Sequence, residues 1–296
     1  MAAETMASER RRGRLRPSAA QMNGYGRALV LSLVAAGGLA GLALLASQLT
    51  VMTGTILLFA RDEWHFWAAG LALALLVGAL AARFAAVAPH ETAGLLPRLA
   101  SPTVSTLPIL PAVATFSAVL LVSIYHTTAM IAIAPAVLAP TLLVALIARY
   151  HLEDDLGQLR RAARSAHILL THGVAFLALA AIYINKVRSL LSASVVAIVV
   201  VLLLVQIADG ERFPTERRLI YGLVGGLVLG EITWALNYWP LTGWTGGAVL
   251  LIAFYLVAGL LLAQVREGVR RRDLLEYGLG AALMFAVVAW RVASSQ

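Results

Sequence analysis

Glu231 is the residue of this sequence best placed to do chemistry. It is the one acidic residue, of 15, that falls inside a strongly apolar stretch, the run from Tyr221 to Trp244 (YGLVGGLVLGEITWALNYWPLTGW). A carboxyl group at the centre of a bilayer costs about 2.5–3.5 kcal/mol, so we expect it to face protein or water and to have a partner. There it could act as a proton or cation relay, or anchor a polar ligand. The structural alternative is an interhelical hydrogen bond that fixes helix register.

A second set of polar residues is expected at the outer membrane face. Asp62, Glu63 and His65 precede or open one apolar run, and His126 lies in the tight turn between two others. The tryptophans and tyrosines around them are typical of an interfacial aromatic belt, but a belt does not require acids or histidines. If these helices are neighbours, the sequence predicts an outward-facing polar pocket formed by Glu231, Asn237, Asp62, Glu63, His65 and His126.

Small and polar residues recur along the Glu231 stretch at spacings of four and three. On a helix these positions share one face: Gly222, Gly226, Gly230, Thr233 and Asn237. Small residues at this spacing let a second helix approach closely, so the three glycines predict a helix-packing face. Glu231 lies about 100° further round the helix, on the adjacent stripe.

The sequence contains few residues or motifs that could form a metal, cofactor or nucleophile site. There is no cysteine, which excludes disulfides, thiolate metal sites and cysteine catalysis, and no phosphate-binding loop, zinc motif or nucleophile elbow is present. His172 has no second histidine suited to haem, so we interpret it as a packed interhelical histidine. The segment 151–166 (HLEDDLGQLRRAARSA) could bind a metal, but a charge-paired amphipathic helix on the cytoplasmic surface is the favoured interpretation. We expect no cofactor and no metal.

The elements that must position these residues are membrane helices. Of the 296 residues, 60% are hydrophobic and 13% are charged, and the mean hydropathy is +0.85. Apolar runs of at least 18 residues recur along the chain, which indicates an all-α, polytopic transmembrane helix bundle. The net charge of +8 does not indicate nucleic-acid binding, because no loop is long enough to form a binding domain.

About nine spans are predicted, with the N-terminus in the cytoplasm. All but four of the 23 basic residues then lie on the cytoplasmic side, as the positive-inside rule requires; the exceptions are Arg61, Lys186, Arg188 and Arg291. The bacterial cytoplasmic (inner) membrane is the expected location, with the lipid bilayer as the immediate partner. The predicted spans are 28–47, 65–87, 105–124, 128–149, 166–184, 191–208, 219–238, 245–264 and 274–291.

A single domain preceded by an arm is expected. Residues 1–27 are polar and Arg-rich and predict a disordered cytoplasmic arm, and residues 28–296 form a single transmembrane domain. The segment 48–60 continues the first apolar run without completing a further span. It is interpreted as the end of a long tilted first helix, or as an interfacial or re-entrant segment.

One resemblance rests on the runs GEITWALNYWPLTGWTGG and FYLVAGLLLA, in the seventh and eighth spans. They resemble a pattern in bacterial multi-pass membrane proteins that are grouped as a domain of unknown function. The resemblance implies the membrane fold and no particular activity.

A second resemblance concerns Asp62 and Glu63. The pair is similar to the acidic pair that polyprenyl-phosphate-dependent membrane glycosyltransferases carry after their first span, which implies a base or metal ligand. Those enzymes have long outer loops and a larger bundle, whereas here the second span starts at once.

Three function classes remain open. Short loops, the glycine face and the absence of a catalytic motif favour a non-catalytic membrane subunit or scaffold, with a membrane protein partner or a second copy of the chain. A transporter or solute conduit is indicated by Glu231 and by helices that Pro135 and Pro140 would kink. An enzyme acting on a lipid-linked substrate would use Asp62 or Glu63. Fold alone does not separate these classes.

Overall fold

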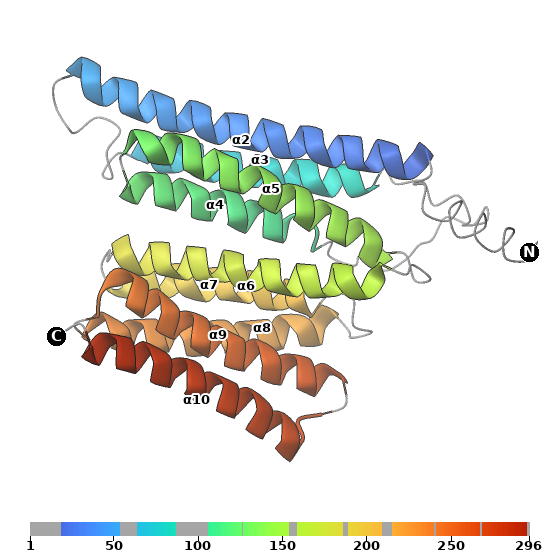
Figure 1. Cartoon of the computed structure of the whole chain (residues 1–296), viewed down its shortest axis with the longest axis vertical. Helices are drawn as coiled ribbons and strands as arrows, with labels where there is room; N and C mark the ends of the chain where they lie inside the picture. The colour runs from blue at the N-terminus through green and yellow to red at the C-terminus, as the bar shows by residue number, and fades with distance from the viewer. Residues whose placement is uncertain are drawn as a thin grey trace, which may run out of the picture.

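The computed structural model describes residues 19–53, 64–86, 106–125, 127–153, 159–185, 189–208, 215–239, 241–266 and 268–294. The regular structure of these residues is entirely helical, which confirms the predicted all-α bundle. The helices lie side by side in a roughly antiparallel arrangement (Figure 1): α2 (Ala19–Thr53), α3 (Trp64–Ala86), α4 (Ile109–Ile124), α5 (Thr128–Glu153), α6 (Arg160–Asn185), α7 (Ser189–Ile207), α8 (Thr215–Asn237), α9 (Gly243–Arg266) and α10 (Arg271–Ala293).

Eight of the described helices are long and apolar enough to cross a membrane, so the chain is a multi-pass membrane protein. The exception is α4, which has 16 residues and extends about 24 Å, less than the roughly 30 Å of a hydrocarbon core. The third predicted span was longer, 105–124. Two prolines explain the late start, because Pro108 and Pro111 lack an N–H and are best accommodated at the beginning of a helix.

Eight of the described helices form two groups of four with the same order of neighbours. In the first group, α2 and α4 each pack against α3 and α5; in the second, α6 and α8 each pack against α7 and α9. Figure 1 shows the first group in blue and green and the second in yellow to orange, with α10 at the edge against α9. The groups meet where α6 contacts α4 and α5, and where α7 contacts α4.

Helix α4 lies at this junction and is almost completely buried. Its first backbone N–H groups have no acceptor within the helix, as at any helix N-terminus. The side chain of Gln206 on α7, only 2% exposed, supplies one acceptor: the N–H of Leu110 donates to Gln206 Oε1 at 2.8 Å. This hydrogen bond ties the second group to the start of α4.

Two glycines of α9 allow this helix to pack closely against α6. A Cβ added at Gly246 would overlap the ring of Tyr183, and one added at Gly247 would overlap the backbone of Ala180. Tyr183 is completely buried, and its hydroxyl donates to the Leu236 carbonyl in the last turn of α8 at 2.9 Å. The buried tyrosine thereby joins α6, α8 and α9.

Three boundaries differ from expectation. Helix α2 begins at Ala19, so residues 19–27 of the predicted arm are helical rather than disordered, and residues 1–18 lie outside the described residues. The same helix continues to Thr53, which agrees with a long first helix over the start of 48–60; residues 54–60 lie outside the described part. The described residues of the segment 151–166 belong mainly to the ends of α5 and α6 rather than to a separate amphipathic helix, and residues 154–158 lie outside the described part.

Candidate functional site

Glu231 lies on the face of α8 that points away from the bundle. Its residue is exposed, as are its neighbours along the same face, Leu227 (64%) and Trp234 (56%). Within the described part of the chain, no hydrogen bond or ion pair to Glu231 is found. In the single chain this carboxyl group therefore does not face the interior of the bundle, and the expected partner is not found among the described residues.

The glycine stripe explains this orientation, because it turns a different side of α8 toward α7. A Cβ added at Gly226 would lie 2.7 Å from the Ala197 carbonyl oxygen, and one at Gly230 would lie 3.2 Å from that of Ala193. Thr233 continues the stripe and is completely buried. At Gly226 the backbones of α7 and α8 approach so closely that a Cβ would fit only if one helix moved, and at Gly230 the approach is tight.

Asn237 faces the same helix as the glycines. Its amide nitrogen donates to Ser192 Oγ on α7 at 3.0 Å, and its buried Oδ1 has no hydrogen-bond partner among the described residues. Six positions along a helix correspond to a rotation of about 240°, so Asn237 and Glu231 point in different directions. Asn237 contributes to helix packing and not to a site shared with Glu231.

The remaining members of the predicted outer pocket are not brought to Glu231. His65 lies in the first turn of α3, with its ring centre 3.8 Å from that of Trp64. Helix α3 packs against α2 and α4, in the other group of four helices from α8. Asp62, Glu63 and His126 lie outside the described residues. Among the residues that the structure places, His65, Glu231 and Asn237 thus do not form one pocket.

An aromatic pair joins the two groups at the predicted outer side. The indole N–H of Trp244, in the first turn of α9, donates to the hydroxyl of Tyr125 at 2.7 Å, and the two rings are stacked with centres 6.4 Å apart. The ring of Phe176 on α6 lies 5.8 Å from that of Trp244. The sequence places Tyr125 and Trp244 on one membrane face, but their direct contact could not be read from it.

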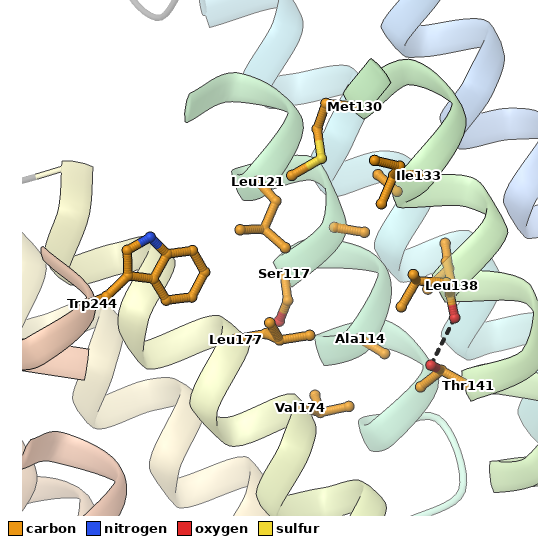
Figure 2. A pocket seen from close by; sticks show the side chains of 13 residues that line it. Ala114, Ser117, Leu121, Met130, Ile133, Leu138, Thr141, Val174, Leu177 and Trp244 are labelled. Atoms are coloured by element: carbon orange, nitrogen blue, oxygen red, sulfur yellow. Dashed lines mark hydrogen bonds between the residues drawn. The ribbon is translucent and has the colours of Figure 1, made fainter. Parts of the chain in front are cut away.

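A cavity of about 220 Å³ lies beside this pair, between α4, α5 and α6 (Figure 2). Its lining includes Ser117 of α4, Met130 and Thr141 of α5, Val174 of α6 and Trp244 of α9. The sequence analysis did not identify this cavity, because the lining comes from four helices. The signal in the sequence is slight: alanine and serine at 114, 117 and 118 narrow one face of α4 opposite the helix that contains Pro135 and Pro140.

The hydroxyl groups at the cavity already donate hydrogen bonds to backbone carbonyl groups. Ser117 Oγ donates to the Val113 carbonyl and Thr141 Oγ1 to the Val137 carbonyl, each at 2.7 Å and within its own helix. The other lining side chains are apolar, apart from the indole N–H of Trp244 that binds Tyr125. The cavity therefore offers a ligand van der Waals contacts rather than hydrogen bonds or charge.

Two further histidines, His151 and His172, contact neighbouring helices. His172 Nδ1 lies 2.8 Å from the Ile168 carbonyl of its own helix, and its ring packs against Phe254 of α9 at 5.3 Å. His151 Nε2 lies 2.7 Å from the hydroxyl of Tyr25, where α5 meets α2. Nowhere in the described ranges do three or more histidines and carboxylates lie close enough to hold a metal ion.

Sequence comparison extends the resemblance seen in the seventh and eighth spans to most of the chain. Neither the search of curated proteins nor the search of solved structures found a match. A family model does match, over residues 46–291, from the end of the first predicted span to the end of the last. The chain therefore belongs to the family described as "Protein of unknown function (DUF5656)".

Proposed function

We propose that this protein is a non-catalytic membrane subunit that binds another helical membrane protein through the outward face of α8. The observation that carries the proposal is Glu231, an exposed carboxyl group on an otherwise apolar face of a membrane helix. The proposed location is the bacterial cytoplasmic membrane, with the N-terminus in the cytoplasm. The proposed partner is a transmembrane helix with a basic or hydrogen-bond-donating side chain.

The depth of Glu231 supports this proposal. It lies six positions before Asn237, where α8 ends, and therefore about 9 Å from the end of the helix. A glutamate side chain is too short to carry its charge that far, and an unpaired carboxyl group in hydrocarbon costs up to about 2.5–3.5 kcal/mol. A donor from a neighbouring helix would offset part of this cost, because the pair would form in a medium without competing water.

The pattern around Glu231 also fits a helix partner. The exposed residues of this face alternate spacings of four and three, which is the heptad pattern of two helices packed side by side. They are Ile220, Val224, Leu227, Glu231, Trp234 and Tyr238. We call this set the α8 seam.

The test is native mass spectrometry of the protein extracted gently from its own membrane, with and without Glu231→Leu. We expect a stoichiometric partner that is lost in this variant and kept in Glu276→Leu, which makes the same change at an exposed glutamate of α10. Circular dichroism should show both variants folded, because neither side chain is buried. A wild-type chain without a protein partner, or a partner that Glu231→Leu leaves in place, would contradict the proposal.

A transporter is the second candidate, and the cavity at the junction of the two groups favours it. Transporters commonly bind their substrates between two helical repeats near the middle of the bilayer. However, Glu231 lies on α8, which does not line this cavity. Proton-coupled uptake into vesicles that is abolished by Glu231→Gln would favour transport over the subunit proposal.

A further inference from the structure

We propose that the cavity between α4, α5 and α6 binds one acyl chain of a phospholipid from the leaflet on the predicted outer side. This inference concerns a different surface from the α8 seam and does not depend on it. It rests on the position, the chemistry and the size of the cavity.

The cavity extends along the membrane normal for about the depth of one leaflet. On α5 its lining runs from Met130 to Thr141, eleven positions and therefore about 16 Å, roughly half of a 30 Å hydrocarbon core. Ile133 and Val137 border it and remain 53% and 50% exposed, so it opens sideways toward the lipid. Trp244, from the first turn of α9, lines one side of the cavity (Figure 2).

The chemistry of the lining favours a hydrocarbon ligand over a polar solute or water. The hydroxyls of Ser117 and Thr141 donate within their own helices, so a polar solute would lose its hydrogen bonds to water without replacement. Water is equally disfavoured, since a buried water normally needs two to four polar partners. If the space stayed empty, its walls would lose their van der Waals contacts.

The volume of the cavity favours a single acyl chain over a whole lipid. A cavity of about 220 Å³ is smaller than the roughly 300–1,000 Å³ of sites that enclose a whole drug-sized ligand. The headgroup therefore remains outside while one tail enters. Because lipid tails are as apolar as the side chains, the retention of this tail comes from shape and close packing rather than from transfer out of water. The bound chain would fill the junction between the two groups of helices.

The test uses protein with Trp244 as its only tryptophan, reconstituted in vesicles of phosphatidylethanolamine and phosphatidylglycerol whose chains are brominated. Bromine quenches tryptophan fluorescence at contact. After transfer into micelles of a bromine-free detergent, we expect residual quenching of Trp244 in this protein, and native mass spectrometry should detect one retained phospholipid. Ala118→Leu with Ala134→Leu fills the cavity and should abolish both signals. Ala132→Leu, on the exposed side of α5, is the matched control and should keep them.

Two results would overturn the inference. One is full recovery of Trp244 fluorescence with detergent alone bound; the other is equal lipid retention in the filled variant and the control. If the filled variant does not fold, the measurements on the protein with an unaltered cavity still test the inference. Both the quenching of Trp244 and the retained mass require a bound brominated lipid.

Discussion

Gln206 and Glu231 are both polar side chains on apolar helices, and their surroundings give them opposite roles. Gln206 is buried and accepts a hydrogen bond from the backbone of α4, so its polarity is satisfied inside the chain. Glu231 is exposed on the α8 seam, so its polarity can be satisfied only from outside. A buried polar residue with a partner indicates structure, and an exposed one in lipid indicates a partner still to be found.

We expect Gln206→Leu to lower the stability of the protein in detergent by about 1–3 kcal/mol, because the buried N–H of Leu110 loses its acceptor. The measurement is the thermal unfolding midpoint. Gln264→Leu is the control, since Gln264 also accepts a backbone hydrogen bond, from Val269, but at an exposed position. Equal shifts for the two variants would show that the hydrogen bond to α4 contributes nothing of its own.

At the scale of elements, glycine faces determine which sides of the helices meet. The stripe from Gly222 to Gly230 brings α8 against α7, and Gly246 and Gly247 bring α9 against α6. The close contact with α7 is the reason that Glu231 faces outward, because the two residue sets lie on different sides of one helix.

We expect Gly226→Ala to destabilise the protein by about 1–3 kcal/mol, since the added methyl would collide with the Ala197 carbonyl and α7 would have to move. Gly173→Ala is the control: no atom lies within 4 Å of a Cβ built there, and alanine favours a helix over glycine by up to about 1 kcal/mol. Unfolding midpoints of the two variants should therefore change in opposite directions. A Gly226→Ala protein as stable as wild type would refute the close approach.

These elements also show what the sequence could predict. Apolar runs identified the helices, because every membrane helix must satisfy its backbone internally and be long enough to span. Periodicity grouped Gly222, Gly226 and Gly230 on one side, but it could not identify α7 as their neighbour or show that Glu231 would then face outward. The junction cavity was missed for the same reason, since Ser117, Thr141 and Trp244 meet only in three dimensions.

At the scale of the whole molecule, the described residues form two groups of four helices with the same order of neighbours and one peripheral helix. Among the described residues of α10, only Ala281 is buried, and this helix packs mainly against α9 through Tyr277 and Tyr255. Helix α10 follows the eight helices of the two groups and makes the number of described helices odd. The described ends of the chain therefore lie on opposite sides of the bundle (Figure 1).

We expect substituted cysteines to show these opposite sides directly, because the chain contains no cysteine of its own. In spheroplasts, a membrane-impermeant maleimide should label Ser294→Cys at once and should label Glu216→Cys, before the apolar part of α8, only after permeabilisation. Labelling of both positions from outside would disprove an odd number of spans between them, and the reverse pattern would invert the proposed orientation.

During synthesis at the ribosome, α4 enters the membrane before its cap exists. Leu110 and Gln206 are 96 positions apart, so at about 5–20 residues per second the acceptor follows roughly 5–20 s after the donor. Throughout that interval the first four helices can associate, but the start of α4 stays without the contact that the finished protein gives it. The packing of the first four helices is therefore completed only when α7 is added. A chain that stops before α7 leaves the N–H of Leu110 without its acceptor inside the bundle.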